Sequence, residues 1–451
     1  MTVETLARAC LLPSFPGTQP PEWIRRFLAE GGAGLTLFAY NVPSREQLAE
    51  LTAAVRVERP DALFAIDEEG GDVTRLEAAE GSSSPGNAAL GAVDDLALTE
   101  SVAESIGAQL AAVGVNWNLA PVADVNVPGN PVIGVRSFGD DAGLVARHVQ
   151  AFVTGLQRTG VAACAKHFPG HGATEQDSHL ELPTVTGDVE AGLEPFRAAI
   201  RAGVRSIMTA HVRVPALGDV PATLNPAAVQ GLLRERLGFD GVVLADALEM
   251  RAVSATVGVE EGAVLALAAG VDALCIGHDL GEDAVDAIVA AVADAARSGR
   301  LPEERVAEGA ARVRALAEWT TTHLNVSTPV LTSAADSAAR RALVVEGDVR
   351  VAHGARIVEL SAAPNIAAGE HAHSLDGAVI AHEGEAVPDA DVYVVRDAHR
   401  HAWMRDAADR EGVVVVEVGL PVWRPVHTRG YLATHGRSRV SLDAAREGLG
   451  L

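Results

Sequence analysis

The sequence predicts an α/β protein, a (β/α)8 TIM barrel followed by a short α/β sandwich-like C-terminal domain. Two observations predict the barrel. Eight short apolar runs alternate with amphipathic helical patterns over residues 9–276, which indicates buried parallel strands joined by helical crossovers. The polar, ionisable clusters come directly after these runs. This is the distribution expected when loops at the carboxyl ends of barrel strands build a site.

The eight runs have the length of strands, and the segments between most of them have helical periodicity. Pro13 ends the first run early, since proline cannot continue a central strand. A further helix is predicted over residues 302–319. The expected strands are residues 9–12, 34–40, 63–66, 115–119, 161–165, 206–209, 241–245 and 273–276, and the expected helices include 44–57, 96–113 and 142–159.

A stretch rich in Thr, Ser and Pro, residues 320–329, is typical of a linker. We therefore divide the chain into a barrel domain (1–320), a linker (321–335) and a small α/β domain (336–451). The last part has no spaced glycines after a strand, the pattern of a phosphate-binding loop, and we expect it to support the barrel. Its expected strands are 357–360, 378–381, 392–395 and 413–418, and its expected helices are 397–410 and 441–448.

The composition excludes several classes of protein. With 451 residues, 48% of them hydrophobic, the chain can bury a sizeable core. Lys and Arg total 36 against 60 Asp and Glu, a net charge of −24, so nucleic acid and anionic membranes would be repelled. No basic leader or membrane-length apolar run is visible. Three scattered cysteines, Cys10, Cys164 and Cys275, indicate reduced core thiols and a cytoplasmic protein. The oligomeric state stays open.

The densest ionisable cluster is residues 166–179, KHFPGHGATEQDSH. It follows the fifth apolar run, where a loop rich in glycine would expose a site. Within it Asp177 lies two residues before His179. An aspartate that orients and charges an imidazole makes a proton shuttle near neutral pH. The alternative is an ordinary Asx turn beside a surface histidine.

A metal site in the same loop is a weaker hypothesis. His167, His171, Asp177 and His179 could supply ligands, and a His-x3-His spacing occurs in zinc sites. The glycines and proline make this loop unlike helical zinc motifs, and Lys166 would repel a cation. We therefore expect no metal and no cofactor.

Asp246 ends the seventh run, directly before a predicted helix. A carboxylate there would face the mouth of the barrel on a rigid base, where a nucleophile or a metal ligand is placed. It would equally serve as a helix N-cap.

Charged groups at neighbouring strand ends suggest a polar ligand. Asp67, Arg136 and Lys166 are suited to hydrogen bonds with sugar hydroxyls. Salt bridges at the barrel rim are the alternative for each. Arg75 is less informative, because an exposed arginine after a turn is common.

Together these segments resemble glycoside hydrolase family 3, in particular its bacterial β-N-acetylglucosaminidases. Residues 166–179 are similar to the family's K-H-F-P-G-H-G segment and the D-S-H that follows it. The resemblance runs in order over about residues 9–320. The other similar segments are 67–76 (DEEGGDVTRL, resembling D-x-E-G-G-x-V-x-R-L), 130–139 (NPVIGVRSFG, resembling R-S-F-G), 221–224 (PATL) and 245–250 (ADALEM).

The resemblance implies a retaining, two-step β-N-acetylglucosaminidase that acts on terminal β-linked N-acetylglucosamine, including cell-wall muropeptide fragments in peptidoglycan recycling. It implies that Asp246 is the nucleophile and that His179, assisted by Asp177, is the acid/base. A small carbohydrate is then the only partner expected. The positions implied to bind the sugar before the cleaved bond are Asp67, Arg75, Arg136, Lys166 and His167.

Three other functions remain open. A histidine in place of one catalytic carboxyl group is neutral once deprotonated, so phosphate could replace water and make the protein an N-acetylglucosaminide phosphorylase. A β-glucosidase or β-xylosidase is disfavoured, because those relatives lack the D-S-H loop. A catalytically silent sugar-binding protein is the alternative outside enzymes.

The end of the chain departs from the usual family pattern. Residues 336–345 resemble the entry helix and first strand of the family's second domain, but the segment from there to Leu451 is short for that domain. In some relatives that domain supplies the acid/base. With Asp177 and His179 in the barrel, we expect the short domain to be structural or to shape the aglycone side.

Overall fold

The computed structural model describes residues 1–174, 176, 181–277, 280–325, 333–362 and 374–451. Its first part is a barrel of parallel strands, hydrogen-bonded in the order β1-β8-β7-β6-β5-β4-β3-β2. Between β1 and β2 the Thr36 N–H donates to the Pro13 carbonyl at 3.0 Å and brings the two ends of the sheet together. The predicted (β/α)8 barrel is confirmed. Its strands are β1 (Leu11–Leu12), β2 (Gly34–Leu37), β3 (Leu63–Ile66), β4 (Trp117–Asn118), β5 (Ala162–Phe168), β6 (Ser206–Thr209), β7 (Val242–Ala245) and β8 (Ala273–Cys275).

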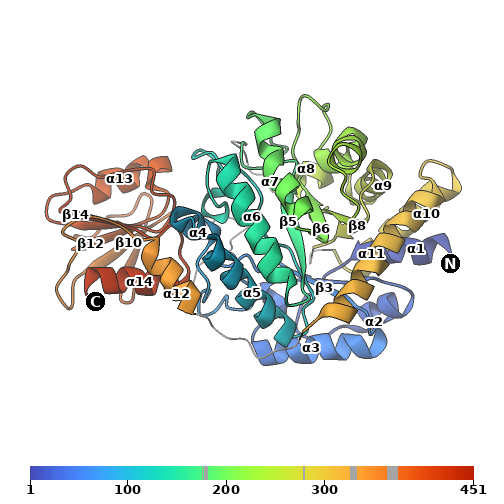
Figure 1. The fold of residues 1–451 in the computed structure, drawn as a ribbon, viewed down its shortest axis with the longest axis horizontal. Helices are drawn as coiled ribbons and strands as arrows, with labels where there is room; N and C mark the ends of the chain where they lie inside the picture. The colour runs from blue at the N-terminus through green and yellow to red at the C-terminus, as the bar shows by residue number, and fades with distance from the viewer. Residues whose placement is uncertain (175, 177–180, 278–279, 326–332, 363–373) are drawn as a thin grey trace.

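Helices surround the barrel (Figure 1). Three of the longer ones begin where the sequence provides an N-cap: the side chains of Ser44, Asp95 and Asp141 each accept the backbone N–H three residues further along. The helices are α1 (Val3–Arg8), α2 (Glu22–Ala29), α3 (Arg45–Glu58), α4 (Asn87–Val93), α5 (Leu96–Ala112), α6 (Ala142–Gln157), α7 (Val189–Arg201), the π-helix η4 (Ala227–Arg236), α8 (Arg251–Ser254), α9 (Val259–Ala269), α10 (Glu282–Arg297) and α11 (Glu303–His323).

Some strand boundaries differ from the prediction. β2 ends at Leu37, not at Tyr40, because the Asn41 side chain accepts the Phe38 N–H at 3.0 Å and turns the backbone into a short 3-10 helix. β5 is longer than predicted and includes Lys166 and His167. The first residues of the ionisable cluster therefore belong to the barrel wall and not to the loop.

The barrel interior is filled by alternate strand residues. The Trp117 indole N–H of β4 donates to the Ser206 hydroxyl of β6 at 2.7 Å. These strands are not neighbours, so both side chains must point inward. Trp117 packs in one cluster with Val242 and Leu244, whereas Val243 of the same strand packs with the outer helices. Residues of α11 join the inner cluster and close the N-terminal end of the barrel.

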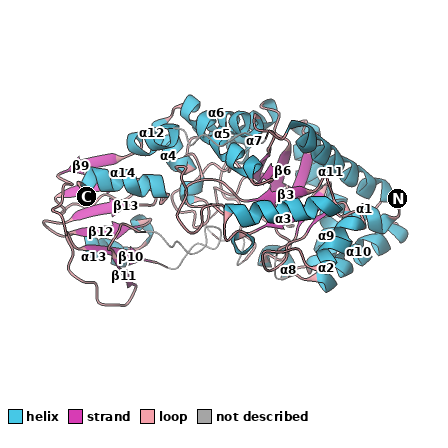
Figure 2. Cartoon of the chain, turned by 90° about the horizontal axis from the view of Figure 1, so that it is seen from below, coloured by secondary structure: helices cyan, strands magenta, loops and turns pink. Residues whose placement is uncertain are grey.

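The second part of the chain is a six-stranded sheet in the order β11-β10-β12-β13-β14-β9, parallel except for β9. Its strands have helices packed against them, and it lies at the end of the molecule farthest from the N-terminus (Figures 1 and 2). The predicted α/β sandwich-like domain is confirmed. Its elements are α12 (Ser333–Arg341), β9 (Val344–Gly347), β10 (Ile357–Ser361), β11 (Val379–His382), β12 (Val392–Val395), α13 (Ala402–Ala408), β13 (Val414–Glu417), β14 (Gly430–Ala433) and α14 (Arg439–Leu449).

Two predictions in this region need correction. The helix expected over 397–410 is broken, because Asp397 adopts a left-handed conformation (φ 51°) and a 3-10 turn, Ala398–Arg400, precedes α13. The residues 320–323, expected at the start of the linker, continue α11. Their threonine hydroxyls donate to carbonyls of the preceding turn and so remain compatible with a helix. The domain boundaries themselves stay a prediction.

Helix α12 packs against α4 and α5 of the barrel and against α14 of the second domain. It therefore connects the two parts of the molecule (Figure 1). Within the described part of the chain, no helix combines the length and the apolar character needed to cross a bilayer.

Candidate active site

Three of the predicted site residues, Asp67, Lys166 and Asp246, occupy positions that face the inside of the barrel. Val242 and Leu244 of β7 face inward, so the period of two along a strand directs Asp246 to the mouth of the barrel. Asp67 and Lys166 follow the inward residues of β3 and β5 in the same way. Those inward residues are Leu63, Ala65, Ala162 and Cys164.

Lys166 joins two carboxylates across the mouth. Its Nζ lies 2.5 Å from Asp67 Oδ1 and 2.7 Å from Glu69 Oε1. The side chains of Lys166 and Glu69 are 2% exposed, whereas that of Asp67 is 21% exposed. Burial opposes the charge on Lys166, but the two carboxylates outweigh it and raise its pKa. Asp67 is therefore the member of this cluster that a ligand can reach, and Lys166 holds it in place.

Glu69 also forms a two-pronged ion pair with Arg136. Arg136 Nε and Nη2 donate to the two Glu69 oxygens at 3.0 and 2.8 Å. Burial disfavours the ionised carboxylate, yet Arg136 and Lys166 more than compensate and lower the pKa of Glu69. Arg136 in turn has its pKa raised, chiefly by Glu69 acting against desolvation. The pair is thus fixed in its charged form.

Asp124 orients the His167 side chain at the end of β5 and the backbone at His171 in the loop that follows. His167 Nδ1 lies 2.7 Å from Asp124 Oδ2, and the His171 N–H donates to Asp124 Oδ1 at 2.6 Å. The His167 Nε2 then lies 3.5 Å from Arg136 Nη2. Burial lowers the pKa of His171 to about 4, against the opposing charges of Asp124 and Asp246.

These contacts join all five predicted sugar-binding residues into one network. Arg75 Nη2 lies 3.9 Å from Asp67 Oδ2, whereas Lys166 contacts the other oxygen of that carboxylate. From Lys166 the network runs through Glu69 to Arg136 and His167. The structure therefore brings the predicted binding residues together.

Asp246 lies on the same side of the barrel as this network. Burial raises the pKa of the inward thiol of Cys164 to about 12, and the charges of Lys166, Asp67 and Asp246 all act on it. Asp246 is half-buried, and its Oδ1 accepts the Ala247 N–H at 2.8 Å. His211, at the end of β6, contacts the Ala247 carbonyl through Nε2 at 3.0 Å. The loop that carries Asp246 is thus supported from the neighbouring strand.

Asp177 and His179, the predicted acid/base pair, lie outside the described residues. Two members of the alternative metal set, His167 and His171, have their Nδ1 atoms engaged by Asp124 and Thr174. Within the described residues, no group of three or more His, Cys, Asp or Glu side chains could hold a metal ion.

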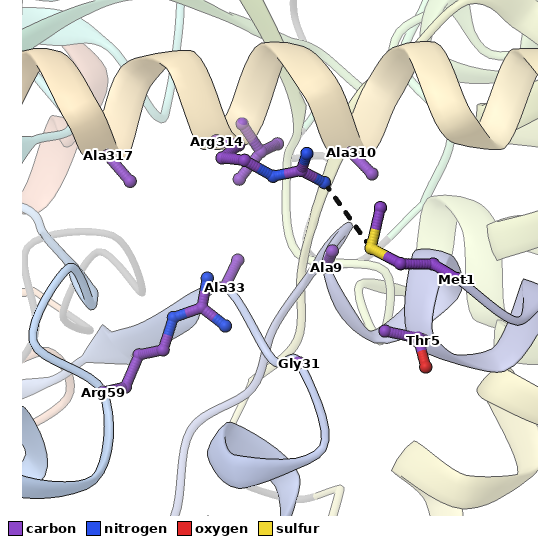
Figure 3. Close-up of a pocket in the computed structure, with 10 residues that line it drawn as sticks. Met1, Thr5, Ala9, Gly31, Ala33, Arg59, Ala310, Arg314 and Ala317 are labelled. Atoms are coloured by element: carbon purple, nitrogen blue, oxygen red, sulfur yellow. Dashed lines mark hydrogen bonds between the residues drawn. The ribbon is translucent and has the colours of Figure 1, made fainter.

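A separate small pocket lies at the other end of the barrel (Figure 3). Ala9 and Ala33 precede β1 and β2, so the pocket sits at the N-terminal ends of the strands. Arg59 and Arg314 flank it, and Arg314 contacts the Met1 sulfur at 3.8 Å. It shares no residue with the network around Lys166.

The sequence pattern of the glycosyl hydrolase family 3 N-terminal domain matches residues 18–316. This chain belongs to glycoside hydrolase family 3. It is 39% identical over 259 residues to a protein named beta-hexosaminidase from Methylococcus capsulatus, covering 56% of this chain and 78% of the relative. It is 36% identical over 281 residues to a beta-hexosaminidase of Stenotrophomonas maltophilia, covering 60% and 83%.

A solved family 3 structure resembles the whole chain. The β-N-acetylglucosaminidase from Paenibacillus sp. str. FPU-7 is 30% identical to this chain and superposes with a TM-score of 0.85. The match covers 99% of this chain and 96% of the Paenibacillus protein. The sequence relatives align with about three fifths of the chain, whereas this structure also includes the second domain.

Sequence reasoning did not assign the supporting residues of this family 3 site. Glu69 lies in the 67–76 segment, but its neighbour Glu68 is also acidic, and nothing local shows which of these two glutamates meets Lys166. Asp124 lies alone in an apolar stretch after the fourth run. A buried aspartate in such a stretch is the signal that could have drawn attention to it.

Proposed function

We propose that this family 3 protein is a retaining exo-β-N-acetylglucosaminidase, which removes terminal β-linked N-acetylglucosamine from cell-wall-type or chitin-type oligosaccharides. The observation that carries the proposal is that Asp246 and the Lys166–Asp67 pair belong to inward-facing positions at one barrel mouth. The names of the beta-hexosaminidase relatives and of the Paenibacillus β-N-acetylglucosaminidase support the substrate class.

In the first step Asp246 attacks the anomeric carbon and displaces the aglycone oxygen, forming a glycosyl-enzyme ester. His179, oriented by Asp177, donates its proton to the leaving oxygen. Imidazole suits this task because its ordinary pKa of about 6.5 lies near neutral pH. In the second step neutral His179 takes a proton from water, which attacks the same carbon and releases Asp246.

The network around Lys166 binds the sugar in this scheme. Asp67, which is less buried than Lys166 and Glu69, accepts hydrogen bonds from sugar hydroxyls, while Lys166 and Arg75 fix its orientation. Arg136 and His167 form the adjoining wall and are held by Glu69 and Asp124. Such preorganised groups align the anomeric carbon with the nucleophile.

The deciding experiment is product analysis with p-nitrophenyl β-N-acetylglucosaminide. The purified protein is assayed by NMR with and without phosphate, together with Asp246→Asn. We expect free N-acetylglucosamine at the same rate in both buffers and a loss of kcat of at least about a thousandfold in the variant, because it removes the nucleophile. Asp240→Asn, an exposed residue just before β7, is the matched control and should keep normal rates.

Each other outcome has a defined meaning. A phosphate-dependent rise in sugar 1-phosphate would make the protein a phosphorylase. Turnover of glucoside or xyloside controls alone would change the substrate class, and saturable binding without turnover of any of them would indicate a sugar-binding protein. Near-normal rates for Asp246→Asn would remove Asp246 from the mechanism.

His179→Ala should slow substrates with poor leaving groups more than those with good ones, because a good leaving group needs little protonation. Equal losses for both kinds of substrate would contradict an acid role of His179.

The cellular role proposed with this activity is peptidoglycan recycling in the cytoplasm. The three cysteines are buried free thiols, which suits a reducing compartment.

A further inference from the structure

We propose that Arg396 of the second domain is a positioning residue for the barrel site: with Asp72 it holds the β3 loop, and so Asp67 and Glu69, in the shape that binds sugar. The inference rests on the proposed function and assigns the second domain a part in it. The loop concerned is residues 67–76, between the end of β3 and the barrel rim.

The β3 loop is a tight turn with Asp72 at its tip. The Glu69 N–H donates to the Val73 carbonyl at 3.0 Å, and the Val73 N–H donates back to Gly70 at 3.3 Å. Asp72 lies inside this small ring, three residues from the carboxylate that binds Lys166 and Arg136. A shift of the tip is therefore transmitted directly to Glu69, and from there to Lys166 and Asp67.

The second domain holds the tip through two contacts to one carboxylate. Asp72 Oδ1 accepts the Arg437 backbone N–H at 2.6 Å. Asp72 Oδ2 forms an ion pair with Arg396 Nη2 at 2.9 Å, without hydrogen-bond alignment. The Asp72 side chain is 1% exposed. A buried carboxylate needs such partners, because its desolvation is costly when it is left alone.

Both partners stand on a rigid base within the second domain. Arg396 directly follows β12, at the carboxyl edge of the sheet. Arg437 follows β14, and its guanidinium forms a buried two-pronged ion pair with Glu359 of β10, at 2.7 Å for each prong. The Thr434 hydroxyl donates to the Gly436 carbonyl at 2.7 Å and fixes the turn between β14 and Arg437. The carboxyl edge of the second sheet thus fixes the tip of the loop.

A second interdomain ion pair provides a matched control. Arg341 Nη1 lies 2.8 Å from Asp95 Oδ2, with side chains 50% and 34% exposed. It joins α12 to the N-cap of α5, and neither of its two side chains has a hydrogen bond or ion pair to residues 67–76 in the described structure. Loss of either pair weakens docking, but only loss of the Arg396 pair should disturb sugar binding.

The test compares Arg396→Gln and Asp72→Asn with Arg341→Gln and Asp95→Asn in the full-length protein. The first two should lower kcat/KM on p-nitrophenyl β-N-acetylglucosaminide on the order of tenfold, mainly through KM, because misplaced binding groups weaken the ground state as well as the transition state. The control variants should stay within about twofold. Asp72→Asn/Arg396→Gln should lose no more than either single variant, since the two residues act as one unit.

Two further measurements separate positioning from simple stability. Amide hydrogen exchange in residues 67–76 should accelerate in Arg396→Gln but not in Arg341→Gln. Arg396→Lys, which keeps the charge, should have a KM close to that of the wild type. If Arg396→Gln fails to fold, Asp72→Asn decides: an unchanged KM and unchanged exchange of residues 67–76 in that variant would overturn the proposal.

The outcomes also separate this inference from the proposed function. If the wild-type protein releases no sugar from any N-acetylglucosaminide, the proposed function fails, while the exchange comparison still tests whether Arg396 holds the loop. If the wild-type protein is active and Arg396→Gln matches Arg341→Gln in both KM and exchange, the positioning role is wrong and the function stands.

Discussion

At the scale of single residues, two adjacent buried carboxyl groups of the β3 loop have pKa values shifted in opposite directions, although burial acts on both in the same sense. Glu69 meets Arg136 and Lys166, which lower its pKa. Glu68 is equally buried but accepts only hydrogen bonds, mainly from the Arg75 and Leu76 N–H groups, and burial raises its pKa to about 7. Glu69 therefore stabilises the fold above its ordinary pKa of 4.5 and loses that contribution as the pH falls. Glu68 stabilises the fold at low pH and loses that contribution as the pH rises towards its raised pKa.

The Glu68 shift predicts a pH-dependent change in stability. Between pH 4.5 and about 7 the native state holds more protons on Glu68 than the unfolded chain does, so its contribution falls as the pH rises. The unfolding free energy of the wild type, relative to Glu68→Gln, should fall by up to about 3 kcal/mol over that interval. Urea denaturation at pH 5 and pH 8 measures it. Exposed Glu80→Gln is the control; equal pH profiles for wild type and Glu68→Gln would contradict the assignment.

At the scale of elements, one buried aspartate joins three parts of the barrel floor. Asp272, directly before β8, is fully buried. Arg234 of η4 pairs with its Oδ2, and Arg305 and Arg312 of α11 lie 2.5 and 3.2 Å from its Oδ1. It also accepts the Val243 N–H of β7 at 3.0 Å. Helix α11 is thus fixed across the N-terminal end of the barrel by charge as well as by apolar packing.

Asp272→Asn should therefore destabilise the protein strongly. Removing the negative charge leaves the positive charges of three arginines without their common partner, which should lower the free energy of unfolding by about 3–5 kcal/mol. Glu308→Gln is the matched control, because the 61% exposed Glu308 pairs with Arg305 and Arg312 and should cost less than about 1 kcal/mol. Chemical denaturation measures both. Similar losses in the two variants would show that burial of Asp272 does not decide its contribution.

At the scale of the whole molecule, the acidic excess acts on charged substrates. A net charge of −24 repels anions at long range, and added salt screens this repulsion. We expect kcat/KM for an N-acetylglucosaminide with an anionic aglycone to rise roughly two- to fivefold between about 10 and about 150 mM NaCl. The neutral p-nitrophenyl substrate should not respond. Initial rates at the two salt concentrations test this, and an equal response of both substrates would exclude long-range repulsion as the cause.

The barrel and most of its strands could be predicted from local sequence pattern alone. Buried parallel strands are continuous apolar runs, so β3 and β6 occupy the predicted residues. Asp67, Lys166 and Asp246 directly follow such runs, and this position indicated that they lie at the mouth of the barrel. These features depend on local pattern, which a single sequence contains.

Other features needed the tertiary structure. β14, Gly430–Ala433, has no strong apolar run and forms because β13 and β9 pair with it on both sides. The sequence does not distinguish Glu68 from Glu69. Only the fold separates them, because Glu69 meets Lys166 and Arg136 whereas Glu68 accepts backbone hydrogen bonds from Arg75 and Leu76. The contact between Asp72 and Arg396 joins positions in different domains. Contacts between distant segments depend on how whole elements dock, and no local pattern specifies them.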